Sequence, residues 1–437
     1  MGEKIKNSIL FKEIKIEVII RFLLYFILTI YPFILLPEGA PIYIPNRLML
    51  LFDISIILIG LILLDRKIKL YSVNIISLIF LFTLFIASIF SRYKEIAFWG
   101  TISSNEGFFV ICTYILLFIV STNYFKINKK SFNLILIAPT IMCMYGILQF
   151  YGYDPIQKII LGEIVTNSTI GLIGHRNFFS TYIILFLSVY LSYYIFNGGK
   201  KYFICSSIMF AALLCTTTRS GWVSFAIMIF MGLIFILKRK DCLKRASIVF
   251  VVFTSIFITL NYTSSGAIFN RASIIIDEAN GVTNAIINKD IDISDRYGSS
   301  RIFIWKMAMR AFLDKPLLGE GPDTLKSRLM EDYNEKYMGY AKCGDYFEKS
   351  HNEILEYAVS GGIFTAISFC ILIICIIFGV LKNIKNDKFK VLFLMIISYI
   401  SQSMFNISVI MVAPIVWILL GVCVRAYKEG VDSIIKI

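Results

Sequence analysis

Charged residues are scarce in this sequence, and their scarcity excludes most soluble folds. Asp, Glu, Lys and Arg together make up 16% of the 437 residues, whereas an average soluble domain contains about 25%. The mean hydropathy is +0.77, and long apolar runs follow one another with few interruptions. These properties predict a protein that crosses a membrane several times.

Motifs that hold cofactors or metals are also missing. The sequence contains no Walker loop, no HExxH, no GxSxG and no Cys/His cluster, so we expect no cofactor and no catalytic metal. The nine cysteines lie mostly inside apolar runs, without a disulfide framework, and are typical of packing residues. Asp290, Asp292 and Asp295 are a candidate for a loosely held cation, although a solvated loop is the interpretation we favour.

Apolar runs long enough to span a membrane occur about twelve times. A span needs roughly 20 apolar residues. The sequence predicts spans near 17–36, 48–64, 72–90, 107–122, 132–150, 178–196, 202–217, 220–237, 246–262, 353–381, 389–406 and 409–424. We therefore expect an all-α polytopic fold in three parts: residues 1–262 with nine spans, a loop domain at 263–351, and residues 352–437 with three spans.

The formal charge of +14 does not indicate nucleic-acid binding, because the basic residues cluster in short loops between apolar runs. On one side of the predicted membrane these segments hold 24 Lys and Arg residues, and the opposite short loops hold six. Membrane proteins keep the more basic loops in the cytoplasm. The bias predicts cytoplasmic termini and an extracytoplasmic loop domain. The first apolar run carries Arg21 and no small-residue cleavage site, so we expect a retained span.

The unusual polar residues gather on the predicted outer side. Arg219 separates two apolar runs, where an arginine either snorkels to the headgroups or binds a phosphate or carboxylate with its two-pronged guanidinium. Arg301 and Trp305 are four residues apart and share a helix face. On these residues alone, an amphipathic helix lying on the membrane, anchored by the Trp and the Arg, explains them better than a binding role does. Its apolar area would come from Ile302, Phe303, Ala308, Met309 and Phe312.

His351, one of two histidines, is the stronger candidate for chemistry. A neutral imidazole at a water-accessible helix start can accept a proton from a hydroxyl. A purely structural hydrogen bond is the alternative. Asn177 and Asn352 are expected to cap the helices that follow them, and such helix starts favour anionic groups such as phosphate.

An ordered set of motifs resembles the O-antigen ligase/polymerase family. In chain order they are Gly146-Ile-Leu-Gln-Phe-Tyr-Gly-Tyr-Asp-Pro155, Gly174-His-Arg-Asn-Phe-Phe179, Thr218-Arg-Ser-Gly221, Ser300-Arg-Ile-Phe-Ile-Trp305, Asp314-Lys-Pro-Leu-Leu-Gly-Glu-Gly-Pro322 and Ser350-His-Asn352. The N-terminal third is similar to the family only in hydropathy. The resemblance implies a GT-C-like membrane enzyme of about twelve helices with a large outer loop between the ninth and tenth.

The resemblance also implies an activity: transfer of a glycan from a polyprenyl (undecaprenyl) diphosphate carrier to a hydroxyl-bearing acceptor, without a required metal. Arg219 and Arg301 would bind the diphosphate of the donor, and His351 would activate the acceptor. Residues with a possible supporting or substrate-binding role are His175, Arg176, Asn177, Trp305 and Asn352. A displacement of this kind inverts the anomeric centre.

Two alternatives stay open at this point. A polysaccharide polymerase of the same superfamily would use the same donor, with a second lipid-linked glycan as acceptor. A lipid-glycan transporter would need charged or helix-breaking residues near the middle of its spans and an internal duplication, neither of which is clear. The acceptor could be lipid A-core, a cell-wall component or another surface molecule. In each case membrane lipids are partners, nucleic acid is not, and the site lies on the extracytoplasmic face of the cell membrane.

Overall fold

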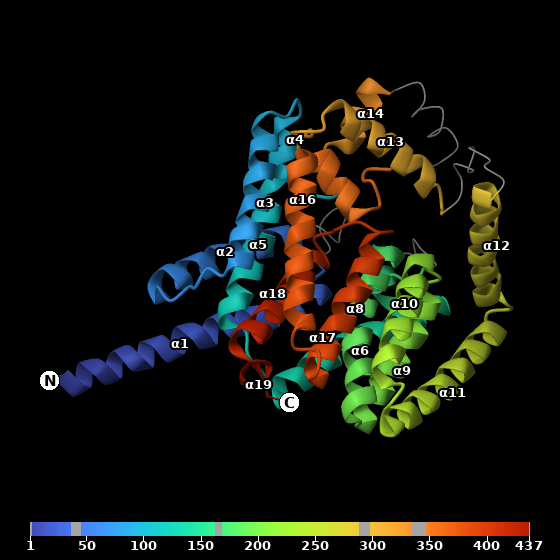
Figure 1. Ribbon diagram of the computed structural model, residues 1–437, viewed down its shortest axis with the longest axis horizontal. Coiled ribbons are helices and arrows are strands. Elements are labelled where there is room, and N and C mark those ends of the chain that lie inside the picture. The colour runs from blue at the N-terminus through green and yellow to red at the C-terminus, as the bar shows by residue number, and fades with distance from the viewer. Residues whose placement is uncertain (1, 36–44, 162–167, 288–297, 334–346, 437) are drawn as a thin grey trace.

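Long apolar helices make up most of the structure (Figure 1). The computed structural model describes residues 2–35, 45–161, 168–287, 298–333 and 347–436. The bundle helices are α1 (Gly2–Thr29), α2 (Pro45–Asp65), α3 (Ser72–Ile89), α5 (Phe108–Tyr124), α6 (Lys129–Phe150), α8 (Arg176–Asn197), α9 (Lys200–Cys215), α10 (Arg219–Ile236), α11 (Lys240–Thr263), α16 (Glu353–Leu381), α17 (Asp387–Ser403) and α18 (Ala413–Glu429). Each of them falls on one of the intervals predicted from hydropathy.

Seven of these helices are long and apolar enough to cross a membrane. They are α2, α3, α6, α8, α10, α11 and α16, and they confirm a polytopic membrane protein. The apolar helix α5 is shorter, with 17 residues. That the remaining predicted spans also cross the bilayer, for a total of twelve, stays a prediction.

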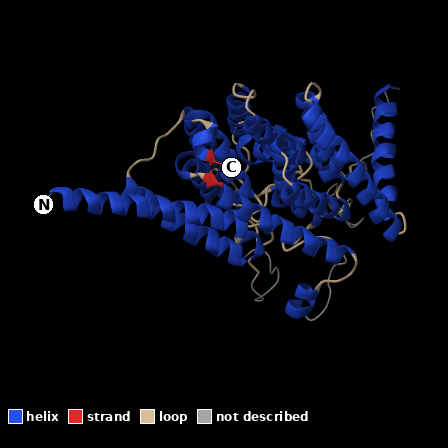
Figure 2. Cartoon of the chain, turned by 90° about the horizontal axis from the view of Figure 1, so that it is seen from below, coloured by secondary structure: helices blue, strands red, loops and turns tan. Residues whose placement is uncertain are grey.

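The centre of the bundle is α8, of which 78% is buried. It packs against α9, α10 and α17, while α5 packs on α18 and α3 packs on α16. A helix that is apolar on all sides is stable only when neighbours surround it, and α8 is surrounded in this way. At the lower end in Figure 1, β1 (Ile127–Asn128) pairs in parallel with β2 (Ile435–Lys436), shown as the red strands of Figure 2.

Shorter elements cover the upper end of the bundle or join its helices. They are η1 (Tyr31–Phe33), α4 (Lys94–Trp99), α7 (Pro155–Leu161), α12 (Ala267–Ile287), α13 (Arg301–Asp314), α14 (Leu325–Asp332) and, near the C-terminus, α19 (Val431–Ile434). In Figure 1, α13 and α14 lie over the upper ends of α16 and α4, while α12 stands beside α10 and α11.

The packing of α13 contradicts the interpretation of this segment as a helix lying on the membrane. Its apolar residues Phe303, Ile304 and Met307 are buried, and they form a separate core with Leu329 of α14 and Val359 of α16. Protein rather than lipid covers this face of α13. Met309 alone among the expected membrane-facing residues is largely exposed, at 45%.

The helices α13 and α14 are together called the cap below. A break in α16 links this cap to the bundle. Gly362 has a φ of +75° and a non-helical ψ of −172°, so the hydrogen-bond ladder of α16 is interrupted there. The freed carbonyl groups of Val359 and Ser360 accept hydrogen bonds from the N–H groups of Glu320 (3.1 Å) and Gly321 (2.7 Å). The Gly-Glu-Gly turn that follows α13 is thereby fixed against α16.

We predict that Gly362→Ala destabilises the protein. A Cβ atom at this position would lie 2.1 Å from the carbonyl oxygen of Leu317, and a positive φ is itself costly for alanine. The expected loss in the free energy of unfolding is about 2 kcal/mol or more, measured as a lower thermal denaturation temperature in detergent. Gly60→Ala is the matched control because no atom lies within 4 Å of the added Cβ. Equal stability of the two variants would contradict the prediction.

Candidate active site

A tight connection between α9 and α10 positions Arg219 as the first residue of α10. Thr217 in this connection has a φ of +50°, a backbone conformation that is uncommon for residues other than glycine. The Arg219 side chain is 11% exposed, and its Nη1 lies 2.6 Å from Oε1 of Glu278 on α12. Its Nη2 donates to the hydroxyl of Ser299. The guanidinium on bundle helix α10 therefore contacts both α12 and the turn that precedes α13.

Arg301 begins α13 after a second strained turn. Ser299 and Ser300 have φ values of +59° and +65°, and Nη1 of Arg301 donates to the carbonyl oxygen of Gly298 at 2.9 Å. The side chain is buried, and its Nε has no hydrogen-bond partner among the described residues. Burial, followed by the charge of Arg219, lowers the pKa of Arg301 to about 10. The guanidinium is charged, dehydrated and only partly bonded.

Two further arginines join this pair. The charges of Arg176, at the start of α8, and Arg271, on α12, both act on Arg301. Burial and then the charges of Arg219 and Arg176 lower the pKa of Arg271, whose Nε donates to the carbonyl oxygen of Thr217 at 3.2 Å. The site is thus a cluster of four guanidinium groups, called the arginine cluster below. Sequence reasoning missed Arg271.

His351 lies beside the arginine cluster, just before α16. It has a φ of +51° and so forms the third strained turn at the entry to a helix of this site. Its Nδ1 is buried without a hydrogen-bond partner in the part of the chain that the structure describes. Burial, then the charge of Arg301 and next that of His175, lowers the pKa of His351 to about 3. The imidazole is therefore neutral throughout the physiological range of pH.

The three principal candidates of the sequence thus meet in one place. Residues 204–370, which include Arg219, Arg301 and His351, match the model of the family described as O-antigen ligase. Over this segment the chain is similar to the O-antigen ligase family. The resemblance based on the motifs is confirmed, although the motifs between Gly146 and Asn177 lie outside the matched segment.

A curated relative supports the same assignment. The chain is 28% identical, over 334 residues, to a ComP-specific O-oligosaccharyltransferase of Acinetobacter baylyi. The aligned region covers 73% of this chain and 56% of the relative, so the chain spans a little over half the length of that protein.

The helix starts around the site correct one expectation and confirm another. Asn352 caps α16, because its side-chain oxygen accepts from the N–H of Leu355 at 3.1 Å. Asn177 does not cap α8. His175 does so instead, with Nδ1 accepting from the N–H of Asn177 at 3.2 Å, because α8 begins two residues earlier than expected. Burial and the charge of Arg176 lower the pKa of His175 to about 4, so that it too is neutral.

Trp305 lies one helical turn after Arg301 on α13. Its indole Nε1 is buried and lacks a hydrogen-bond partner among the described residues. The ring packs against Phe405, with 6.2 Å between centroids and 34° between planes. A dehydrated donor without a partner is costly, so this N–H is available to a ligand in the site.

A buried ionic cluster that sequence reasoning missed holds His351 in place. The ammonium group of Lys349 is buried and contacts the carboxylate of Glu106, which precedes α5, and lies 3.7 Å from Asp323. Asp323 in turn accepts from the N–H of Thr101 at 2.7 Å. These acidic neighbours raise the pKa of Lys349 despite its burial. Truncating one member of such a cluster leaves an unpaired buried charge.

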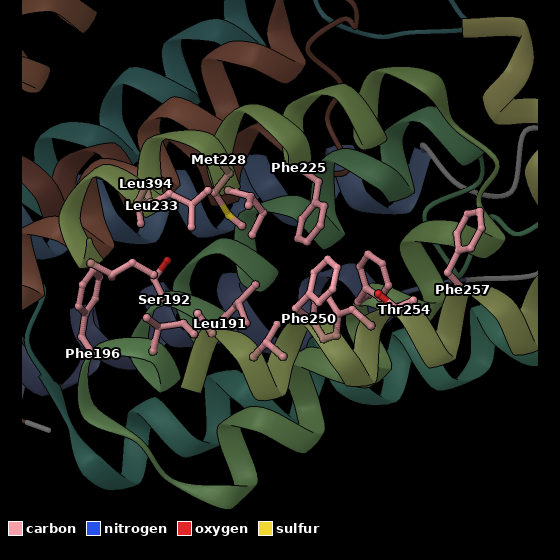
Figure 3. A pocket seen from close by; sticks show the side chains of 18 residues that line it. Leu191, Ser192, Phe196, Phe225, Met228, Leu233, Phe250, Thr254, Phe257 and Leu394 are labelled. Atoms are coloured by element: carbon pink, nitrogen blue, oxygen red, sulfur yellow. The ribbon is translucent and has the colours of Figure 1, made fainter. Parts of the chain in front are cut away.

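An apolar groove runs between helices of the bundle (Figure 3). It lies between α8, α9, α10 and α11, with Leu394 of α17, and has a volume of about 540 Å³. Ser192 and Thr254 are the two hydroxyl-bearing residues in its lining, and aromatic rings such as Phe196 and Phe257 occupy the two ends in Figure 3. Phe225 enters the lining six residues after Arg219, about 9 Å along α10.

A metal site built from acidic residues is not found in the described part of the chain. The described residues contain no group of three or more His, Cys, Asp and Glu side chains that could hold a metal ion. Asp290, Asp292 and Asp295, the candidate for a loose cation, lie outside the described residues.

We predict that both histidines titrate far below the usual value of about 6.5. The expected pKa values are about 3 for His351 and about 4 for His175, measured from the imidazole proton signals in NMR spectra of the two-histidine chain. Arg301→Gln raises the pKa of His351 because it removes the largest charge acting on that ring. Unfolded imidazoles bind protons below about pH 6.5 while the folded ones do not, so stability falls as the pH drops below this value. A His351 that titrates near 6.5 would contradict this description.

Proposed function

We propose that this protein is a membrane glycosyltransferase that transfers a glycan from a polyprenyl diphosphate carrier to a hydroxyl group of an acceptor. The single observation that supports it best is the convergence of Arg219 and Arg301 beside the neutral imidazole of His351. Guanidinium groups bind diphosphate oxygens with two parallel hydrogen bonds. A neutral imidazole can take a proton from a hydroxyl. The match to the O-antigen ligase family model supports the same reaction class.

The chemistry requires stabilisation of a leaving group and removal of a proton. The bond between the anomeric carbon and the phosphate oxygen breaks, and the acceptor oxygen forms the new bond from the opposite face with inversion. The departing diphosphate gains negative charge, which fixed and partly dehydrated arginines stabilise more in the transition state than in the ground state. The proton of the acceptor hydroxyl goes to His351. The charge of the arginine cluster serves where a divalent cation would otherwise be needed.

Donor binding controls how strong a base His351 is. Burial and, second, the charge of Arg301 lower the pKa of the imidazole to about 3. An anionic diphosphate among the arginines offsets that charge and so raises the pKa of His351. The imidazole therefore becomes a better proton acceptor once the donor is in place, which favours binding of the donor before acceptor deprotonation.

The apolar groove suits the isoprenoid chain of the donor. It begins about 9 Å below Arg219 along α10 and continues past Met228 and Gly232 to Ile236. A lipid whose diphosphate binds Arg219 can lay its first isoprene units against this wall. Because lipid tails are as apolar as the groove, the contact contributes orientation more than affinity.

Transfer to a distinct acceptor is favoured over polymerisation, because the curated relative is named an O-oligosaccharyltransferase. We propose an extracytoplasmic site and cytoplasmic termini, on the strength of the 24-to-six bias of basic residues. A polymerase remains the second candidate and is distinguished by its product. One long glycan on the carrier lipid identifies a polymerase, whereas glycan on a different molecule identifies a ligase.

We predict that Arg219→Lys, Arg301→Lys and His351→Gln each abolish most transfer. Lysine keeps the charge but loses the two-pronged geometry, and loss of a general base costs about a hundred- to ten-thousand-fold in rate. The assay uses purified protein, an undecaprenyl diphosphate-linked glycan and candidate acceptors, with products identified by mass spectrometry. Arg310→Lys is the matched control, because Arg310 is an exposed arginine on the same helix as Arg301.

Each variant is checked for insertion before its activity is compared. In a cysteine-free background, a cysteine replacing the exposed Asp277 is expected to react with an impermeant label outside intact cells, and one replacing Ser433 is not. The reverse labelling pattern contradicts the proposed orientation. Normal transfer by both arginine variants would show that these side chains are membrane anchors, and substantial activity of His351→Gln would defeat the assignment of the base.

We predict that Gly232→Phe weakens the use of long-chain donors. Gly232 lines the groove, and a Cβ there meets only Leu394 at 3.6 Å, so a ring at this position extends into the space proposed for the lipid tail. The expected result is a KM for the undecaprenyl donor about three- to tenfold higher, a modest effect because the displaced tail stays in lipid. A donor with a short isoprenoid should be unaffected. Gly60→Phe, on the open face of α2, is the control. Equal effects on both donors would exclude the groove.

A further inference from the structure

Both terminal nitrogens of the Arg219 guanidinium have partners within the protein. Its Nη1 lies 2.6 Å from a carboxylate oxygen of Glu278, and its Nη2 donates to Ser299. A diphosphate that binds through both prongs of Arg219 therefore needs the place that the Glu278 carboxylate holds. Because that carboxylate is also an anion with two oxygens, it resembles the ligand that the arginines are proposed to bind.

The second oxygen of Glu278 connects to the other principal arginine. Oε2 accepts from the N–H of Gly298 at 3.0 Å, and the carbonyl oxygen of Gly298 accepts from Nη1 of Arg301 at 2.9 Å. One carboxylate thus contacts Arg219 directly and reaches Arg301 through the backbone of a single residue, Gly298. Among the described residues, Glu278 is the acid whose charge acts on both Arg301 and Arg271.

The helix that carries Glu278 is only lightly attached to the bundle. Of the described side chains of α12, Ile268 at its start is fully buried, while Ile274 and Ile276 near Glu278 are exposed. Figure 1 shows α12 standing beside α10 and α11 rather than between other helices. Arg271 and Glu278 are seven residues apart and so share the face of α12 that meets the arginine cluster. Withdrawing the carboxylate therefore disturbs little apolar packing.

We propose that Glu278 is an internal substitute for the donor diphosphate, occupying the Arg219 site until the donor displaces it and returning when the polyprenyl diphosphate product leaves. This inference rests on the proposed function. It explains how four arginines remain together in the structure, because the carboxylate offsets part of their mutual repulsion. It also implies that Glu278 limits the affinity of the enzyme for its donor and assists release of the product, which carries the same diphosphate.

Calorimetric titration of the purified full-length protein with undecaprenyl diphosphate tests this proposal. The comparison includes wild type, Glu278→Gln, Asp277→Asn and Arg219→Lys. Asp277 is the neighbouring acid, and it is exposed. Asp277→Asn therefore makes the same change in net charge without freeing Arg219. We expect Glu278→Gln to lower the Kd about tenfold or more, and Asp277→Asn to leave it at the wild-type value.

The outcomes distinguish a failure of the proposal for Glu278 from a failure of the proposed function. An unchanged or higher Kd for Glu278→Gln, or an equal decrease for Asp277→Asn, overturns the inference. A higher Kd would mean that Glu278 orients Arg219 for its ligand. Wild-type affinity of Arg219→Lys instead overturns the diphosphate role of Arg219 and with it the proposed function. In steady-state assays, Glu278→Gln should lower the KM for the donor and strengthen inhibition by undecaprenyl diphosphate, both about tenfold.

Discussion

Positive charge held away from bulk water is the constraint on which this site depends. Guanidinium groups in a partly dehydrated place repel one another strongly and lose much of their hydration. The protein offsets this cost with the Glu278 carboxylate and with backbone carbonyl groups such as that of Gly298. The same field suppresses protonation of His351. The basicity of the catalytic candidate and the affinity for an anion are therefore two consequences of one arrangement of charge.

Strained backbone turns place these groups, and buried ion pairs maintain the turns. Thr217, Ser299 and His351 all have positive φ, and each lies within two residues of a helix start that faces the site. Such conformations persist only where the surroundings fix them. For His351, the contacts of Lys349 with Glu106 and Asp323 supply that fixation. The N-terminal part of the chain, which resembles the family only in hydropathy, therefore contributes to the site through Glu106.

The helices and the main candidate residues could be predicted from local sequence patterns. The long-range contacts between them could not. Hydropathy located the bundle helices, because a span must bury its backbone in a continuous apolar segment. Arg219 stood out because it separates two apolar runs, where an arginine is costly, and Arg301 and His351 stood out through the motifs that contain them. Glu106 and Lys349 are 243 residues apart, and no spacing rule connects such positions. Asn177 was expected to cap α8 by residue preference, but the neighbouring imidazole of His175 does so.

The break at Gly362 leaves the start of α16 with two sets of partners. The nine residues from Glu353 to Gly361 share an apolar core with α13 and α14 and hydrogen bonds with the Gly-Glu-Gly turn. They also contact the bundle, because Tyr357 packs on Phe80 of α3 and Glu353 accepts a hydrogen bond from Tyr399 of α17. Arg301 on α13 is therefore coupled through this short segment to the bundle that carries Arg219. A displacement of the segment would change the separation of the two guanidinium groups, so the geometry of the proposed diphosphate site depends on it.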